Sequence, residues 1–260
     1  MRQTLTLSLV LFSLLLSAAQ ADDSFPLRPL FPGVTTIELN TLHEQRDNML
    51  IVDVRSDYEY QTLHIKGALH IPADESEFIE NLRDLRENDS RTLVFYCNGH
   101  SCRKSYEASV RANQAGIHNH LTFDAGVFDW AKAYPQEAVL LGQALSDGSR
   151  LIGQEKQQQH MLEPEAFATR ARHRDSIVLD IRDNSQKDGI NLFPMRQHSV
   201  ALDNERLASF VHQAKNEGKT LLIYDAVGRQ VSWLQYFLEA EGLKDYYFMR
   251  GGAREFLAFR

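Results

Sequence analysis

The sequence has only two cysteines, Cys97 and Cys102, and they lie close together. In an oxidising compartment two cysteines often form a structural disulfide. A bridge between such near neighbours is too local to staple a domain. The protein must therefore be stabilised mainly by hydrophobic cores, and the two cysteines need another explanation.

Long apolar runs are also scarce. Only residues 5–16 form one, between a short positive start and the small residues Ala19 and Ala21. This pattern is typical of a secretory signal peptide cleaved after Ala21. A spanning helix needs roughly 20 apolar residues, so an uncleaved membrane anchor is the weaker alternative, and no other run is long enough. We expect residues 1–21 to be a signal peptide and the mature protein to be periplasmic or secreted, without a membrane span.

Basic residues are also fewer than acidic residues. The chain has 28 lysines and arginines against 35 acidic residues, a formal net charge of −7. Removal of the signal peptide would take away Arg2 and no acid. A net acidic protein is a poor partner for nucleic acid or for an anionic membrane surface, although a local basic pocket is still compatible with it.

The chain contains an internal repeat. Four landmarks of the first half return in the second half at an almost constant offset of 126 to 128 residues. These pairs are Asp53 and Asp180, Cys97 and Asp225, Ser105 and Ser232, and Gly126 and Gly252. Chance would not keep four landmarks in step, so the sequence predicts one structural unit used twice.

Each unit alternates strands with helices. Short runs rich in Val and Ile predict buried strands, and amphipathic segments with capping residues predict helices. In the first unit the predicted strands are 49–54, 68–71, 92–96 and 120–123, and the helices 56–59, 76–85, 103–114 and 127–133. In the second unit the strands are 177–181, 220–224 and 246–249, and the helices 206–215 and 231–240. The alternation predicts an α/β protein with a mainly parallel sheet in each unit and helices on both faces.

Composition divides the chain further. Residues 22–33 contain three prolines and are expected to be an extended arm. The two units then occupy residues 34–135 and 160–260. Between them, residues 136–159 are polar, with a Ser-Asp-Gly-Ser stretch and a run of three glutamines, a composition typical of a linker.

Cys97 is expected at the carboxyl end of strand 92–96, where ligands bind in open α/β sheets. The chain then enters a helix through a loop in which Gly99 allows a tight backbone path. Backbone amides at a helix N-terminus can form an anion-binding nest and stabilise a thiolate. Arg103 and Lys104 add full positive charge at the rim. The loop therefore predicts a nucleophilic Cys97 over a site that prefers anions.

Three groups of residues resemble the motifs of rhodanese domains. They are Asp53-Val54-Arg55 with Glu59, His64-Ile65-Lys66-Gly67-Ala68 and Ile71-Pro72; Cys97 after an apolar strand; and Asp124-Ala125-Gly126 with Trp130. The resemblance covers residues 35–135 and, with fewer matches, residues 161–260. It implies two rhodanese-like domains in tandem, with the reactive cysteine in the first and none in the second.

The resemblance further implies a sulfurtransferase. The Cys97 thiolate would take sulfane sulfur from a small anionic donor, thiosulfate or a persulfide or polysulfide, and rest as a persulfide. A thiol or another thiophilic acceptor, such as a periplasmic redox protein, would then remove the sulfur. This covalent chemistry needs no metal and no organic cofactor. The loop residues expected to surround the substrate anion are Asn98, Gly99, His100, Ser101, Cys102 and Arg103.

The loop departs from the commonest rhodanese pattern, because Arg103 stands six residues after Cys97 instead of five. The longer spacing resembles that of rhodanese-fold phosphatases and arsenate reductases, which bind tetrahedral oxyanions, so an oxyanion enzyme is an alternative. Against it, the pattern Cys-Asn-Gly-x-x-Cys-x-Lys-Ser also resembles exported bacterial rhodanese-like proteins. The loop also has no carboxylate to protonate a leaving group.

Cys102 is a second departure. It is a candidate resolving thiol that could attack a Cys97 persulfide or sulfenate and form an internal disulfide. Because thiols in an oxidising compartment tend to be oxidised, a non-catalytic redox or binding module is a third alternative.

Other polar residues have simpler interpretations. Asp53 and Arg55 are expected to form a structural ion pair at a strand end. His100 is interpreted as a solvated loop histidine in preference to an acid or base. Asp225, at the position of Cys97, cannot form a persulfide and would repel an anion. We therefore expect the second unit to be a scaffold that packs on the first.

Overall fold

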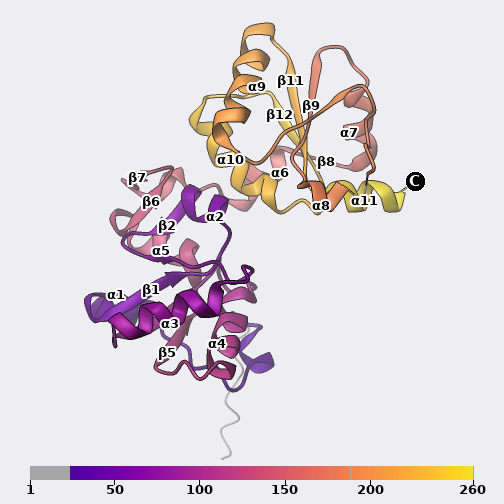
Figure 1. Ribbon diagram of the computed structural model, residues 1–260. Coiled ribbons are helices and arrows are strands. Elements are labelled where there is room, and N and C mark those ends of the chain that lie inside the picture. Colours follow the sequence, from indigo (N-terminus) through magenta and orange to yellow (C-terminus); the bar gives the residue numbers. More distant parts are fainter. Residues whose placement is uncertain (1–23, 188, 260) are drawn as a thin grey trace, which may run out of the picture.

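The computed structural model describes residues 24–187 and 189–259, so the expected signal peptide, residues 1–21, lies outside the described part. The chain forms two bodies, one from each half of the sequence, and each has its own sheet (Figure 1). Within the described ranges no helix is long and apolar enough to span a bilayer.

The first sheet has the order β3-β1-β4-β5, and all its strands are parallel. Its strands are β1 (Met49–Asp53), β3 (Leu69–His70), β4 (Thr92–Tyr96) and β5 (His120–Phe123). The last four residues of β1 and of β4 are buried. Such continuous burial is expected where both faces of a parallel sheet are covered. Strand β4 is central, so the loop that follows it starts in the middle of the sheet edge.

Helices cover both faces of this sheet. They are α3 (Phe78–Asn88) and α4 (Lys104–Gln114) on one face, and α1 (Leu39–Gln45) and α5 (Gly126–Ala133) on the other, with α2 (Asp57–Thr62) beyond β1. Successive residues of a strand point to opposite faces. Ile51 accordingly packs in one core cluster with Trp130, whereas Val52 packs in the other with Phe78.

The second sheet repeats this plan. Its order is β10-β9-β11-β12-β8, again wholly parallel. The strands are β8 (Met161–Leu162), β9 (Ser176–Asp180), β10 (Gln197–Ser199), β11 (Thr220–Tyr224) and β12 (Tyr246–Met249). Helices α9 (Asn204–Glu217) and α10 (Gln230–Ala240) cover one face, and α7 (Pro164–Ala171) and α11 (Gly252–Phe259) the other; α8 (Asn184–Lys187) lies in the loop after β9. The predicted α/β class is confirmed, with parallel sheets flanked by helices.

The segment predicted as a linker, residues 136–159, is structured and lies partly in the first core. It contains β6 (Ala138–Leu140), β7 (Gln143–Ala144) and α6 (Gln154–Gln159), with 3-10 turns at Pro135–Glu137 and Gly148–Arg150. Strand β6 pairs antiparallel with β2 (Leu63–Ile65). Ala138, Leu140 and Leu145 are buried in the first half. The prediction of a linker is therefore wrong for residues 138–145: the composition of the whole segment is polar, but its short apolar run at residues 138–141 contains strand β6.

The two halves contact each other through α2 and α10 (Figure 1). Trp233 and Tyr236 of α10 belong to the core cluster of the first half. Tyr58 of α2 donates its hydroxyl hydrogen to Oδ1 of Asn204 at 2.7 Å. The hydroxyl of Tyr236 accepts a hydrogen bond from the backbone amide of Ile152 at 3.1 Å. The second half therefore packs on the first.

Candidate functional site

Cys97 directly follows β4 and is only 1% exposed. Its carbonyl oxygen accepts a hydrogen bond from the backbone amide of Val127 at 3.0 Å, in the first turn of α5. The two segments approach so closely that a Cβ at Gly126 would lie 2.4 Å from the amide nitrogen of Gly99. Gly126 also has a φ of +68°, which favours glycine. The start of α5 thus holds the loop after Cys97 in a fixed backbone position.

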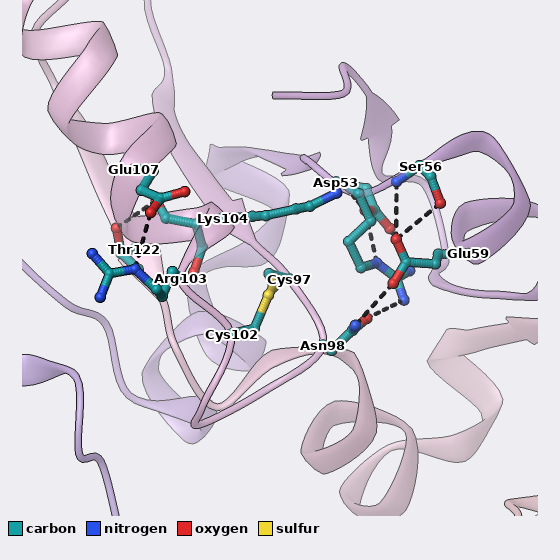
Figure 2. The surroundings of a disulfide bond; sticks show 12 residues. Asp53, Ser56, Glu59, Cys97, Asn98, Cys102, Arg103, Lys104, Glu107 and Thr122 are labelled. Carbon is teal, nitrogen blue, oxygen red and sulfur yellow. Dashed lines mark hydrogen bonds and ion pairs between the residues drawn. A yellow bond between two sulfur atoms is a disulfide. The ribbon is translucent and has the colours of Figure 1, made fainter. Parts of the chain in front are cut away.

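Cys97 and Cys102 form a disulfide inside this loop (Figure 2). Their Cα atoms are 6.2 Å apart. The loop turns back on itself because the amide of Cys102 donates to the carbonyl oxygen of Gly99 at 2.8 Å. Cys102 is partly exposed, whereas Cys97 is buried. In this state Cys97 is not a free nucleophile, and its chemistry requires prior reduction.

The residue after the cysteine is held by a polar network. Arg55, which is fully buried, donates from Nη1 to Oδ1 of Asn98 at 3.0 Å. Asn98 donates in turn from Nδ2 to Oε1 of Glu59 at 2.9 Å. The other oxygen of Glu59 accepts hydrogen bonds from Ser56 and so completes the capping box of α2. Helix α2 and the strand end thereby orient the side chain next to Cys97.

Arg55 is anchored by the expected ion pair with Asp53. Its Nη2 lies 2.6 Å from Oδ2 of Asp53, and both side chains are fully buried. Burial opposes the charge of Arg55, but the neighbouring Asp53 carboxylate outweighs burial and raises the pKa of the guanidinium. Arg55 therefore stays cationic, and the pair links the end of β1 to the cysteine loop.

The two cations at the end of the loop are paired with carboxylates. Arg103 donates from Nε to Oε1 of Glu107 at 3.0 Å and points away from the disulfide (Figure 2). The ammonium of Lys104 lies 2.6 Å from Oδ2 of Asp74. Neither the Arg103 side chain nor the Lys104 side chain is directed at the disulfide (Figure 2). In the disulfide state the expected contact between Arg103 and an anion is thus replaced by an ion pair with Glu107.

The interpretation of His100 as a solvated loop histidine is wrong, because its ring contacts three other residues. Its Nε2 lies 2.7 Å from Oδ2 of Asp129, and its Nδ1 lies 2.5 Å from the carbonyl oxygen of Ser24. The ring also stacks on Phe25 with centroids 4.3 Å apart. Partial burial lowers the pKa of His100, but the bonds to Asp129 and to the carbonyl of Ser24 outweigh it and raise the pKa overall. His100 therefore ties the arm to α5.

The described part of the arm, from Ser24, is anchored over the first half. Arg28 donates from Nε to Oδ2 of buried Asp124 at 2.7 Å. Phe31 stacks on Tyr106 of α4 with centroids 4.9 Å apart, and Cζ of Arg103 lies 5.0 Å from the centroid of the same Phe31 ring. Sequence reasoning missed these partners, because the spacing of Arg28, Phe31 and Asp124 carries no signal that they meet.

Asp225 occupies the corresponding position of the second half, after β11. Its carboxylate is 1% exposed and accepts hydrogen bonds from four backbone amides. These donors are Val227 at 3.0 Å, Gly228, Gln230 at 2.6 Å and Val231 at 3.4 Å. The side chain thus fills an amide cradle at the start of α10. This loop spans residues 225–229, two fewer than residues 97–103 of the first half. Asp225 therefore does more than repel an anion, because it is itself the anion in the cradle.

Comparison with known proteins identifies a domain in the first half of the chain. Residues 36–133 match the model of the rhodanese-like domain family. Two relatives are tRNA uridine(34) hydroxylases, from Salmonella arizonae at 28% and from Salmonella heidelberg at 30% identity, each over 114 residues. These matches cover 43% of this chain and 31% of each relative, so the chain matches about a third of their length. The chain therefore contains a rhodanese-like domain, which includes Cys97 and Cys102.

Solved structures give weaker likenesses. A thiosulfate sulfurtransferase from Pseudomonas aeruginosa is 18% identical, covering 88% of this chain and 46% of that chain, with a TM-score of 0.37. The rhodanese-like domain of an Anabaena sp. protein is 19% identical, covering 45% of this chain and 89% of that chain, with a TM-score of 0.35. The rhodanese-like domain is identified by the match of residues 36–133.

Proposed function

We propose that this protein is a sulfurtransferase that moves sulfane sulfur from thiosulfate, or from a persulfide or polysulfide donor, to a thiophilic acceptor. The observation that carries the proposal is the place of Cys97 within the rhodanese-like domain. It lies at the carboxyl end of a central parallel strand, in a loop that enters the 11-residue helix α4. Ligands bind at such strand ends, and a helix N-terminus favours a thiolate.

The proposed reaction begins with the reduced loop. The Cys97 thiolate attacks the outer sulfur of thiosulfate, the sulfur–sulfur bond of the donor breaks, and sulfite leaves with the electron pair. The persulfide that results lies in the loop that leads from β4 into α4. A thiol or another thiophilic acceptor then attacks the terminal sulfur, and Cys97 leaves again as the thiolate.

The second half has a scaffolding role in this proposal, as a degenerate second rhodanese-like domain. Asp225 stands where a nucleophile would be needed, and its carboxylate is engaged by four amides. The expected periplasmic or secreted location belongs to the same proposal. In such a compartment the disulfide would form readily, so the enzyme needs a reductant to start.

The test is the intact mass of the reduced mature protein after exposure to thiosulfate and, separately, to polysulfide. Cys102→Ser, in which Cys97 is the remaining thiol, is expected to gain the mass of one sulfur atom, and Cys97→Ser is expected to gain none. Cyanide should remove the added sulfur as thiocyanate. If Cys102→Ser takes up no sulfur although Cys97 is shown to be reduced, the proposal is wrong.

A redox or binding module is the second candidate, and the Cys97–Cys102 disulfide is the observation that favours it. Rapid alkylation of the protein in its own compartment, followed by mass analysis, tests this function. A pair that is fully oxidised there, and that releases no sulfite from thiosulfate once reduced, would support it over sulfur transfer.

A further inference from the structure

We infer that Cys102 discharges the Cys97 persulfide within the loop, so that the protein releases hydrogen sulfide and is regenerated by an external dithiol. This activity is a reduction of the sulfane sulfur donor, and it rests on the proposed formation of a Cys97 persulfide. It goes further by assigning a chemical role to Cys102 and a class of co-substrate to the protein.

The first support is the position of the two sulfur atoms. The loop backbone already holds Cys97 and Cys102 at a disulfide bond, with Cα atoms 6.2 Å apart. The turn from Gly99 to Cys102 and the contact of Gly99 with Gly126 maintain this path. A reduced Cys102 would consequently face the sulfur of Cys97 without a large movement of the chain.

The second support is the difference in exposure. Cys97 is buried, so a macromolecular acceptor has poor access to a persulfide on it. Cys102 is partly exposed and lies between Ser101 and Arg103, both of which are exposed. An internal thiol therefore reaches the persulfide more easily than an external protein does. Cys102, as the partly exposed cysteine, is the one that an external thiol can reach.

The reaction balances in three steps. First, the Cys97 thiolate takes the outer sulfur of thiosulfate and sulfite leaves. Second, the Cys102 thiolate attacks Sγ of Cys97, the bond from this Sγ to the terminal sulfur breaks, and hydrosulfide leaves with the electron pair and takes up a proton. Third, an external dithiol attacks Sγ of Cys102, Cys97 leaves as a thiolate, and the second thiol of the reductant completes its own disulfide. The sum converts thiosulfate and a dithiol into sulfite, hydrogen sulfide and a disulfide.

The difference in exposure also favours the direction of the third step, because an external dithiol reaches the partly exposed Cys102 before the buried Cys97. Attack on Cys102 releases Cys97, which is the sulfur that must be a thiolate for the next turnover. Reduction through Cys102 thus restores the nucleophile directly.

The test is a single turnover without oxygen. The protein is reduced, freed of reductant, and mixed with one equivalent of thiosulfate, and then sulfite, sulfide and intact mass are measured. Wild type should release sulfite and sulfide in equal amounts and lose the mass of two hydrogen atoms. Cys102→Ser and Cys102→Ala should release sulfite, release no sulfide and keep the mass of one added sulfur atom. Cys97→Ser should release neither product.

Each outcome has a distinct meaning. If wild type releases sulfite and keeps the added sulfur as Cys102→Ser does, the role of Cys102 is wrong while sulfur transfer by Cys97 stands. If wild type and both Cys102 variants release no sulfite, although alkylation shows that Cys97 is reduced, the proposed function itself fails and the inference falls with it. Two replacements at Cys102 are used so that misfolding of one variant does not decide the result.

Discussion

The guanidinium carbon of Arg55 lies 5.2 Å from the ring centroid of Trp233. Arg55 belongs to the rhodanese-like domain and donates to Asn98, next to Cys97. Trp233 comes from α10 of the second half and is 7% exposed. Phe128 also stacks on Trp233, with centroids 5.3 Å apart. Trp233 of the second half therefore contacts Arg55, and Arg55 donates a hydrogen bond to Asn98 beside Cys97.

The first prediction concerns this contact. Trp233→Ala should slow sulfur uptake by Cys97, because Arg55 and Phe128 both lose the ring against which they lie. A cation–π contact is worth about 0.5–2 kcal/mol, and loss of a buried aromatic side chain costs roughly 3–5 kcal/mol of unfolding free energy. The measurement is the rate of persulfide formation, followed by the intact mass of samples quenched at successive times. Urea unfolding of the same proteins gives their stability. Trp233→Phe is the control, since it keeps an aromatic ring. An unchanged rate in Trp233→Ala would show that the second half does not position the loop.

The second prediction compares two glycines with similar backbone conformations. Gly126 has φ +68° and Gly116 has φ +74°, but an added Cβ meets the backbone of Gly99 only at Gly126. Gly116→Ala should cost about 1–2 kcal/mol through its positive φ alone. Gly126→Ala should cost more and should also slow alkylation of reduced Cys97, because the loop must shift. Denaturant unfolding and alkylation rates measure the two effects. Equal losses at both positions would mean that the close contact with the loop has no energetic importance.

The third prediction concerns Asp225. Asp225→Ala leaves four backbone amides without their acceptor, one of them buried and three partly buried. A buried donor without an acceptor costs on the order of 1–3 kcal/mol. We expect a clear loss of stability, partly restored by sulfate, because the emptied amide cradle can accept an external anion. Thermal unfolding at increasing sulfate, with sodium chloride at matched ionic strength, is the measurement, and wild type is the control. A variant that responds to sulfate no more than wild type does would contradict the role of Asp225 as an internal anion.

The fourth prediction is a dependence on pH at His100. The fold raises the pKa of His100 above its ordinary value, through Asp129 and the carbonyl of Ser24. A raised pKa means that the folded state binds the proton more tightly. The stabilisation is therefore fully present below the unfolded pKa of about 6.5 and is lost as the pH rises through the folded value. Asp129→Asn should lower the pKa of His100 in an NMR titration.

The same variant should reduce unfolding free energy more at about pH 5.5 than at about pH 8.5. The described arm should also become easier to cleave by protease in the variant at the lower pH. An unchanged pKa of His100 in Asp129→Asn would show that the 2.7 Å contact does not control its protonation.

Several features of this protein follow from the sequence by itself. Short, mainly apolar runs placed β4, β5, β11 and β12 to the residue, because strands of a parallel sheet covered on both faces are rich in apolar residues. The strand-end motif predicted the Asp53–Arg55 pair, which depends on residues two positions apart. The position of Cys97 at the end of β4 followed directly from the strand.

Other features were decided only by the tertiary structure. The short edge strand β10 has the sequence Gln-His-Ser and carries no apolar residue, and it forms because β9 supplies hydrogen-bond partners. Nothing in the sequence neighbourhood of Trp233 shows that it packs on the other half. The anchoring of His100 by Asp129, and the filling of the amide cradle by Asp225, likewise depend on where the loops fold. A sequence pattern reports burial and local hydrogen bonding, whereas contacts between distant segments arise only when the sheets and helices have been packed together.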